Sequence, residues 1–210
     1  KLMPDTFTAQ AMIMTDRGNN QITAFHPGAM QLAHEQRITA DVPVQLAILA
    51  PDGCEATLAH AEQLHALGVP FVFDPGQGLP MFDGDTLQGL VDKADWITVN
   101  DYEAKMLCER LGCDEAALSR RVQGLVVTLA EQGCDVWRNG LATRVAGVQA
   151  QAVVDPTGCG DAWRGAFLFG LEQGWDLLRC AELGNQLGAL KVASQGPQNY
   201  TVDRQALALA

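Results

Sequence analysis

The amino-acid sequence predicts an α/β fold, a mainly parallel sheet flanked by helices with a small β lid, from three observations. Short runs rich in apolar and β-branched residues, at 44–50, 69–75, 95–100 and 124–130, have the composition of strands buried in a parallel sheet. Helix-length segments separate these runs, and strands that alternate with helices build a parallel sheet covered on both faces. The segment 6–25 instead has the pattern of two strands joined by a turn, which predicts a separate small sheet.

The lid comes first along the chain. Its two strands, TFTAQAMIMT and QITAF, flank Asp16, Gly18 and Asn19, which supply turn chemistry and predict a β-hairpin. Apolar residues alternate along the first of these strands, so one face of the hairpin is expected to be packed and the other exposed. The following segment, 27–43, is mixed in composition and predicts a loop.

Helices separate the strands of the predicted α/β domain, and glycine ends two of them. The periodicity predicts helices over 53–68 and 101–112, stopped by Gly68 and Gly112, since glycine readily adopts the left-handed conformation that closes a helix. An Asn-Gly pair at 139–140 is a strong type I′ turn signal and predicts a hairpin. The remaining predictions are helices at 83–94, 161–174 and 176–195, and 134–145 as the span of the hairpin.

Length and composition bound the class of protein. With 210 residues, of which 48% are hydrophobic and 19% charged, the chain has the profile of a soluble globular protein with one main core. Residues 1–30 are interpreted as part of the lid and 31–210 as the α/β domain, with its N-terminal strands absent. The six cysteines show no paired CxxC spacing and are expected to be free thiols.

The charge balance argues against a nucleic-acid partner. A formal net charge of -11 and a pI of about 4.6 leave no excess of basic residues to replace the counterions of a phosphate backbone. The sequence shows no apolar run of bilayer-spanning length and no basic-then-apolar leader, so no membrane association is expected. A cytoplasmic location and a small-molecule substrate are the predictions that follow.

Ligands of open α/β sheets bind beyond the carboxyl ends of the strands, and three motifs lie at such positions. Asn100 and Glu103 follow the strand at 95–100 and can hold a hydrated Mg²⁺ ion. They can equally form a capping box at the start of a helix, and the residues alone favour that alternative. Thr128 follows another strand, where its hydroxyl can contact a phosphate or simply close the strand.

The third motif is the stretch DPTGCGD, which leads into a predicted helix. Gly158, Cys159 and Gly160 allow a ligand to approach the backbone amides at the helix start, where the helix dipole favours an anion. Asp161 adds a carboxylate there, and a kinase acting on a hydroxyl needs both a base and an anion hole. The alternative is a helix cap beside two turn glycines. Because Asp155 also lies in this loop, the functional interpretation is favoured.

At these residues the chain resembles the ribokinase-like (PfkB) family of carbohydrate and nucleoside kinases. DPTGCGD resembles the family's D-T-x-G-A-G-D signature, NDYE at 100–103 matches N-x-x-E, and VVTLAEQGCDVW resembles T-x-G-x-x-G. The three motifs occur in the family's order, and the resemblance covers essentially the whole chain. Cys159 stands for the usual alanine and Ala130 for the usual glycine, and neither departure removes a required functional group.

The resemblance implies ATP-dependent phosphorylation of a primary hydroxyl. Asp161 would be the catalytic base, and Gly158, Cys159 and Gly160 would form the anion hole. The nucleotide would lie along the residues that match the family's ATP-binding positions, which are Thr128, Gly133 and, near the adenine, Asn185.

The resemblance also implies two kinds of cation. Asn100 and Glu103 would organise Mg²⁺ and phosphate through water, so ATP and Mg²⁺ are the expected cofactors. Asp155 matches the position that in many members helps to hold a monovalent cation, which makes K⁺ a further expected cofactor.

The substrate is inferred from a variant of the signature. GDAWRGAF resembles the form typical of bacterial adenosine and related nucleoside kinases, which implies transfer to the 5′-hydroxyl of an adenosine-like ribonucleoside. Phe7, in the lid segment, would cover the base, or else only pack within the lid. A sugar kinase of the same family and a non-catalytic nucleotide-binding relative are the alternatives, and pairing of lids makes a homodimer an open prediction.

The first residue bears on the same comparison. The chain begins at Lys1 rather than Met, and family members carry strands, a sugar-binding aspartate and a Gly-Gly motif before the lid. The resemblance therefore implies that an N-terminal portion is missing from this sequence.

Overall fold

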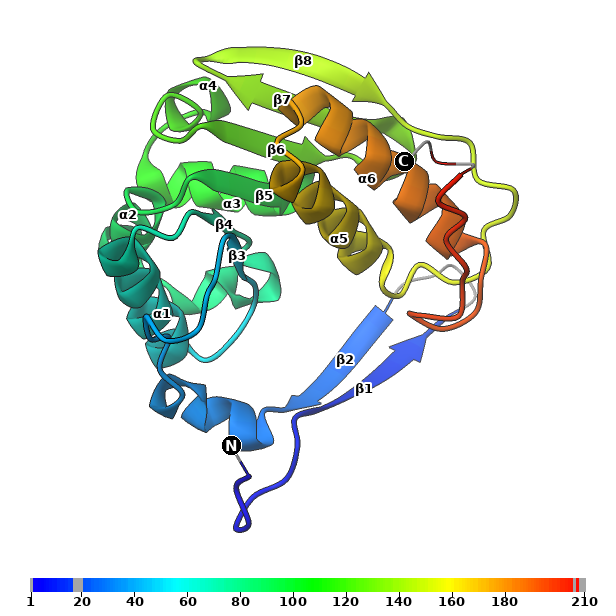
Figure 1. Ribbon diagram of the computed structural model, residues 1–210. Helices are drawn as coiled ribbons and strands as arrows, with labels where there is room; N and C mark the ends of the chain where they lie inside the picture. Colours follow the sequence, from blue (N-terminus) through cyan, green and yellow to red (C-terminus); the bar gives the residue numbers. More distant parts are fainter. Residues whose placement is uncertain (1, 17–20, 206, 208–210) are drawn as a thin grey trace.

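A six-stranded sheet forms the centre of the part of the chain that the structure describes, residues 2–16, 21–205 and 207 of a computed structural model (Figure 1). Neighbouring strands in the sheet are also neighbours in the sequence, in the order β3-β4-β5-β6-β7-β8. The first four are parallel, and β7 and β8 add to the edge as an antiparallel pair. The strands are β3 (Ala47–Leu49), β4 (Phe71–Phe73), β5 (Trp96–Asn100), β6 (Gly124–Thr128), β7 (Gly133–Arg138) and β8 (Leu141–Ala146).

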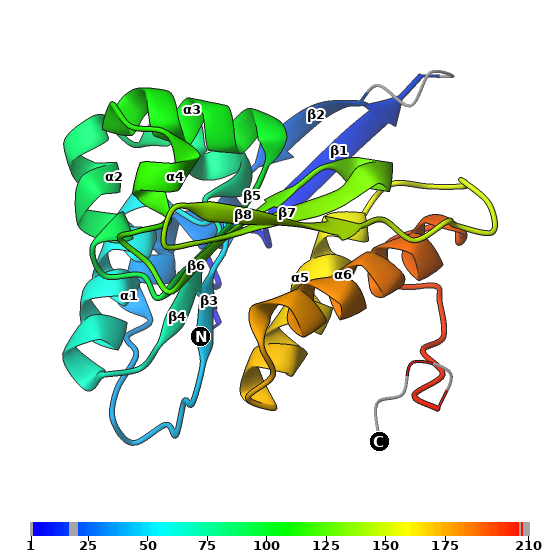
Figure 2. The same ribbon diagram turned by 90° about the horizontal axis from the view of Figure 1, so that it is seen from above.

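Helices cover both faces of this sheet, which confirms the predicted fold class. Figure 2 shows α1 to α4 on one side of the sheet and α5 with α6 on the other. The helices are α1 (Cys54–Leu67), α2 (Gly84–Val91), α3 (Asp101–Leu111), α4 (Glu115–Leu118), α5 (Cys159–Glu172) and α6 (Leu177–Val192). Short 3-10 helices accompany them, namely η1 (Gly28–Glu35), η2 (Gly76–Met81) and η3 (Ala130–Gln132).

The core is divided by the sheet into two layers, because successive residues of a strand point to opposite faces. In β4, Phe71 and Phe73 belong to the core beneath α1 to α3, whereas Val72 belongs to the core beneath α5 and α6. Trp163 and Phe167 of α5 stack with ring centroids 5.0 Å apart in that second layer. The parallel strands β4, β5 and β6 are buried on both faces along most of their length, as their apolar composition predicts, whereas β3 is half-buried at two of its three residues.

Local turn chemistry also follows the predictions. Gly68 and Gly112 close α1 and α3 with φ values of 66° and 64°, in the left-handed region where a side chain is disfavoured. Asn139 and Gly140 connect β7 to β8 with φ values of 51° and 84°. Positive φ at both central residues is the signature of the expected type I′ turn.

Two predictions about the N-terminal segment differ from the structure. β1 (Gln10–Thr15) and β2 (Gln21–His26) pair as the expected antiparallel hairpin, but every residue of β1 is exposed. The expected packed face is therefore missing among the described residues, because this hairpin stands apart from the main sheet (Figure 1). The predicted turn residues Gly18 and Asn19 lie outside the described residues. The predicted loop at 27–43 contains η1.

None of the helices in the described ranges is both long enough and apolar enough to span a lipid bilayer.

Candidate functional site

The loop that leads into α5 brings backbone amides to one end of the core layer between the sheet and helices α5 and α6. Gly158 is the N-cap residue of this helix, with a φ of 84°, and a Cβ atom there would lie 2.9 Å from Cβ of Pro197. A side chain at this position is thus opposed by both the backbone conformation and the neighbouring segment. The first turn of a helix leaves amides without intrahelical acceptors, and Gly160 and Asp161 contribute such amides at α5. This geometry suits an anion.

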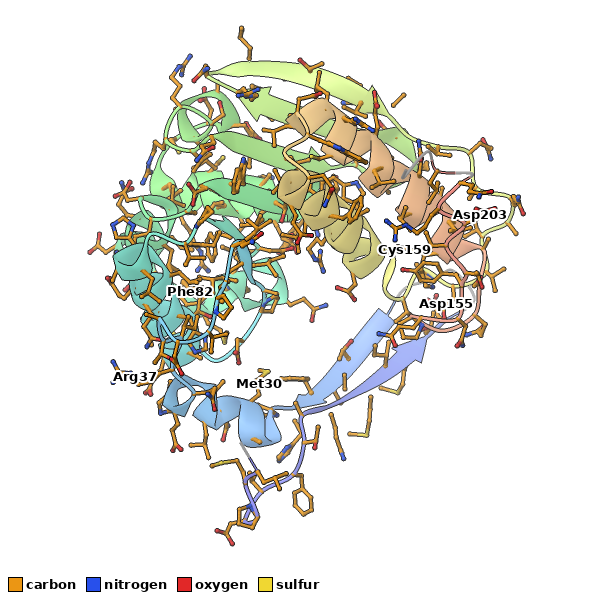
Figure 3. The ribbon with its side chains drawn as sticks, in the orientation of Figure 1. Met30, Arg37, Phe82, Asp155, Cys159 and Asp203 are labelled. Atoms are coloured by element: carbon orange, nitrogen blue, oxygen red, sulfur yellow. The ribbon has the colours of Figure 1, made fainter. Side chains whose placement is uncertain are left out.

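Cys159 occupies the first helical position of α5, where Figure 3 labels it together with Asp155 of the preceding loop. Its amide donates to the carbonyl oxygen of Pro156 at 3.1 Å, so this amide is engaged within the loop itself. Burial raises the pKa of the Cys159 thiol, which keeps the side chain neutral near an anion. The predicted anion hole thus has its most accessible donors at Gly160 and Asp161.

Asp161 is joined to a second carboxylate through one arginine. Its side chain is 77% exposed, and Oδ1 accepts from Nη2 of Arg164 at 2.7 Å. The Nε atom of Arg164 lies 2.8 Å from Oδ2 of Asp74, a side chain that is only 2% exposed. One guanidinium therefore holds an exposed and a buried carboxylate at the carboxyl end of the sheet.

Asp74 follows β4 directly, so the end of that strand fixes the carboxylate. Burial raises its pKa to about 6, partly offset by the positive charge of Arg164, while Glu103 and Asp161 add negative charge that raises it further. Thr98 of β5 donates its hydroxyl to the same carboxylate at 3.2 Å. Asp74 was not among the site residues predicted from the sequence, although an acidic residue at the carboxyl end of a buried strand is itself a usable signal.

Asn100 and Glu103 form the capping box that the residues alone favoured. The Glu103 amide donates to Oδ1 of Asn100 at 2.8 Å, and the Asn100 amide donates to Oε2 of Glu103 at 2.9 Å. Both side chains start α3 where β5 ends. In the described ranges, no group of three His, Cys, Asp or Glu side chains is placed to ligate a metal directly.

Thr128 lies beside Asn100, because the two residues are register partners in the pairing of β5 with β6. The structure thus brings these two predicted site residues together. The hydroxyl of Thr128 donates to the carbonyl oxygen of Val99 at 3.4 Å, a contact that ties the two strand ends. Gly133 follows with a φ of 94°, and a Cβ atom there would lie 2.1 Å from the carbonyl oxygen of Val145. Only glycine fits that position.

Ala130, where the resembling family has glycine, adopts a φ of 50° in the left-handed region. We expect Ala130→Gly to raise the free energy of unfolding by about 1 kcal/mol, because glycine adopts this conformation without the steric cost of Cβ. Urea unfolding measures the change. Ala142→Gly, in the exposed strand β8, is the matched control and is expected to lower stability by roughly 0.5–1 kcal/mol. A loss of stability in both variants would contradict the assignment of strain to Ala130.

Asn185 is buried in α6 and its side chain is fully engaged within the fold. Nδ2 donates to the carbonyl oxygens of Val145 and Ala146 at 3.3 and 3.0 Å, and Oδ1 accepts from Nε1 of Trp163 at 3.0 Å. These bonds connect α5, α6 and β8. Its predicted contact with the adenine of ATP stays a prediction. The predicted contact of Phe7 with the substrate base also stays a prediction; Phe7 precedes β1 and is 74% exposed.

Asp155 accepts hydrogen bonds at each of its three oxygen atoms. Oδ1 accepts from the Thr157 amide, Oδ2 accepts from the Gly196 amide and the Gln195 side chain, and the carbonyl oxygen accepts from Nζ of Lys191. The two backbone amides are the main reason that the pKa of this carboxyl is lowered to about 2. The oxygen atoms of Asp155 are thus surrounded by hydrogen-bond donors, one of which is an ammonium group. Such an environment does not fit a residue that ligates K⁺.

A pocket of about 470 Å³ adjoins Asp161, between α5, α6 and the C-terminal segment. Asp161 and Gly165 line one side of it, and Pro197 and Tyr200 line the other. The candidate base thus borders a space large enough for a small organic ligand.

Comparison with known proteins gives a consistent result. Curated nucleoside kinases from Methanocaldococcus jannaschii and Methanothermobacter thermautotrophicus are 28% and 29% identical, over 91% and 96% of this chain. The chain spans 63% and 66% of their lengths. A solved Burkholderia thailandensis nucleoside kinase in complex with inosine is 48% identical with a TM-score of 0.93, covering 98% of this chain and 67% of that chain.

A second solved structure of the Burkholderia thailandensis enzyme, in complex with ADP-inosine, is 48% identical with a TM-score of 0.91, covering 98% of this chain and 64% of that chain. Residues 1–204, nearly the whole sequence, match the family described as pfkB family carbohydrate kinase. The order of motifs, the parallel sheet and the placement of Asp161 at the start of α5 agree with that match. The chain belongs to the pfkB family of carbohydrate kinases.

Proposed function

We propose that this chain carries the phosphoryl-transfer machinery of an ATP-dependent kinase that phosphorylates the 5′-hydroxyl of a ribonucleoside such as adenosine or inosine. The observation that carries the proposal is the placement of Asp161 beside open amides at the start of α5, next to a pocket. Similarity to nucleoside kinases, one of them solved with inosine and with ADP-inosine, supports the substrate class.

Asp161 would act as the base in this reaction. Its carboxylate would take the proton of the 5′-hydroxyl as the new O–P bond forms and the bond between the β,γ-bridging oxygen and phosphorus breaks, releasing ADP. The amides of Gly160 and Asp161 would stabilise the charge that develops on the transferred group. Arg164 supports this role, because its guanidinium lies beside Asp161 and offsets repulsion between the carboxylate and the phosphates.

Glu103 is the residue best suited to hold a hydrated Mg²⁺. Its Oε2 atom is used in the capping box, which leaves Oε1 to accept from metal-bound water, with Asn100 fixing the side chain. When bound, Mg²⁺ would neutralise charge on the ATP phosphates. Thr128 and Gly133 would line the nucleotide, since they lie at the same end of the sheet as Asn100.

Residues 1–30 would form part of a lid over the substrate. The supporting observation is that the hairpin and the residues just before it present exposed apolar side chains, among them Phe7, Met12 and Ile22. An exposed apolar surface of this kind suits contact with a nucleoside base or with the lid of a second chain.

The test of the proposed function is ADP release from ATP and Mg²⁺ with five acceptors, namely adenosine, inosine, guanosine, ribose and fructose 6-phosphate. We expect turnover with one or more nucleosides and little with the sugars. Turnover with a sugar alone would replace the nucleoside proposal by a sugar kinase of the same family. ATP binding without turnover on any acceptor would instead identify this chain as a nucleotide-binding member without catalysis.

A further inference from the structure

Lys191 is a buried, positively charged residue in the last turn of α6. This residue is 0% exposed, and it directly follows the apolar segment LGAL. Burying an ammonium group costs several kcal/mol unless the group is paired and hydrogen-bonded, so a lysine at this position requires a structural reason. Lys191 was not among the site residues predicted from the sequence.

The partners of the ammonium group are oxygen atoms of two separate segments. Nζ donates to the carbonyl oxygen of Asp155 at 2.5 Å and to that of Ser194 at 3.3 Å. The Asp155 carboxylate lies close enough for the positive charge of Lys191 to lower its pKa. One cation is therefore surrounded by two peptide carbonyls and faces a carboxylate.

Backbone hydrogen bonds show that these two segments are joined around Lys191. The amides of Val154 and Asp155 both donate to the carbonyl oxygen of Val192, at 2.8 and 3.1 Å. The Gly196 amide donates to the Asp155 carboxylate at 2.8 Å, which links the other side of the joint. The segment after α6 thus holds the loop that leads into α5 and to the candidate base.

Proteins offer K⁺ a similar environment, in which carbonyl and carboxylate oxygens surround a single positive charge that has lost its water. An ammonium group carries the same charge and supplies directed donors in addition. A second cation at these oxygens would be repelled by the fixed charge of Lys191.

We propose that the Lys191 ammonium group is a built-in monovalent cation that holds the loop of Asp155 in place, so that this chain requires no K⁺ there. The proposal concerns the joint between two segments and does not depend on the identity of the kinase substrate. It departs from the cation requirement that the family resemblance implied for Asp155.

The first test compares the thermal unfolding midpoint of the unaltered chain in KCl and in choline chloride at equal ionic strength. We expect the same Tm in both salts, because the cation position is filled by the protein. A Tm that is higher in KCl than in choline chloride would overturn the proposal, since it would reveal a site that K⁺ occupies.

The second test uses Lys191→Met, which keeps an unbranched side chain and removes the charge. We expect Tm to fall by roughly 6–12 °C, as for loss of one partner of a buried ionic contact. KCl should restore part of this shift, and choline chloride should not, because K⁺ fits where the ammonium group was. An equal Tm of this variant in both salts would also overturn the proposal.

Lys93→Met is the matched control. Lys93 likewise donates to a backbone carbonyl, that of Gly89 at 3.1 Å, and it pairs with Glu62. Its variant should show no difference between the two salts. If Lys191→Met fails to fold, equilibrium dialysis of the unaltered chain with Tl⁺, an ion of similar size to K⁺, decides the question. Saturable Tl⁺ binding that K⁺ displaces would contradict the proposal, and no such binding supports it.

Discussion

Asp161→Asn is expected to lower nucleoside-dependent ADP release by about 100- to 10,000-fold, the usual contribution of a general base. The amide cannot accept the proton of the attacking hydroxyl, although it has nearly the size of the carboxylate. The backbone amides at the start of α5 are unchanged, so affinity for ATP should stay within a few-fold of the unaltered chain. Initial rates of ADP release and equilibrium binding of ATP measure the two quantities separately.

Asp176→Asn is the matched control for that variant. Asp176 caps the start of α6 by accepting from the amides of Leu178 and Arg179, and asparagine caps a helix equally well. Its variant should keep both the rate and the affinity. Residual turnover of Asp161→Asn within tenfold of the unaltered chain would exclude Asp161 as the base.

Arg164→Ala is expected to destabilise the fold by about 3 kcal/mol at pH 8, and by much less at pH 5. The substitution leaves the buried Asp74 carboxylate without its positive partner. Burial already raises the pKa of Asp74 to about 6, and loss of Arg164 raises it further. At pH 5 this carboxyl is protonated in the folded state, so the missing guanidinium costs little there.

The sign of the pH dependence follows from linkage. Because the folded-state pKa of Asp74 is above its ordinary value, the folded state binds a proton more readily than the unfolded state. The contribution of Asp74 to stability therefore falls as pH rises from about 4 to about 6, and it falls over a wider range in Arg164→Ala. Urea unfolding of both chains at pH 5 and pH 8 measures the difference.

Arg144→Ala serves as the control for the pH series. Arg144 pairs with Asp135 on the surface of β7 and β8, with its side chain 50% exposed. A pair of this kind contributes about 0–1 kcal/mol, and no dependence on pH is expected between 5 and 8. An equal loss of stability at the two pH values in Arg164→Ala would show that Asp74 is not the group that requires the arginine.

The sequence predicted those features of the fold that depend on local chemistry. Gly68 and Gly112 end their helices, and the Asn-Gly pair turns its hairpin, because the conformation of each position is set by the residue itself. The buried strands β4, β5 and β6 were also predicted correctly, since a strand covered on both faces must be apolar along its length. The run at 44–50 was predicted to be buried in the same way, but its strand, β3, is shorter and mostly half-buried.

The features that the sequence did not predict depend on contacts between distant residues. Asp74 and Arg164 lie ninety positions apart, and nothing local to either residue names the other. Lys191 meets Asp155 only after α5 and α6 have packed on the sheet. The prediction of a packed face on the hairpin was wrong for a related reason. Alternation of apolar residues in β1 indicates a face suited to packing, but it does not tell whether any described residue covers that face.

At the capping box, the sequence could name the residues but not choose between roles. The same positions of Asn100 and Glu103 serve a helix start and a hydrated cation, and the structure shows the hydrogen bonds of the helix start. A carboxylate has two oxygens, so the two roles do not exclude each other.

The sequential order of strands in the central sheet has a consequence for how the chain folds during synthesis. Each of the strands β4 to β8 pairs with the strand made just before it, so the loops to be closed are short and this part of the sheet can grow in chain order as the chain leaves the ribosome. The surface around Val72 and Val126, however, is covered by α5 and α6, which are synthesised after all six strands of this sheet. Nascent chains should therefore expose an apolar sheet face until residue 192 has emerged, and this is the interval in which a chaperone would bind them.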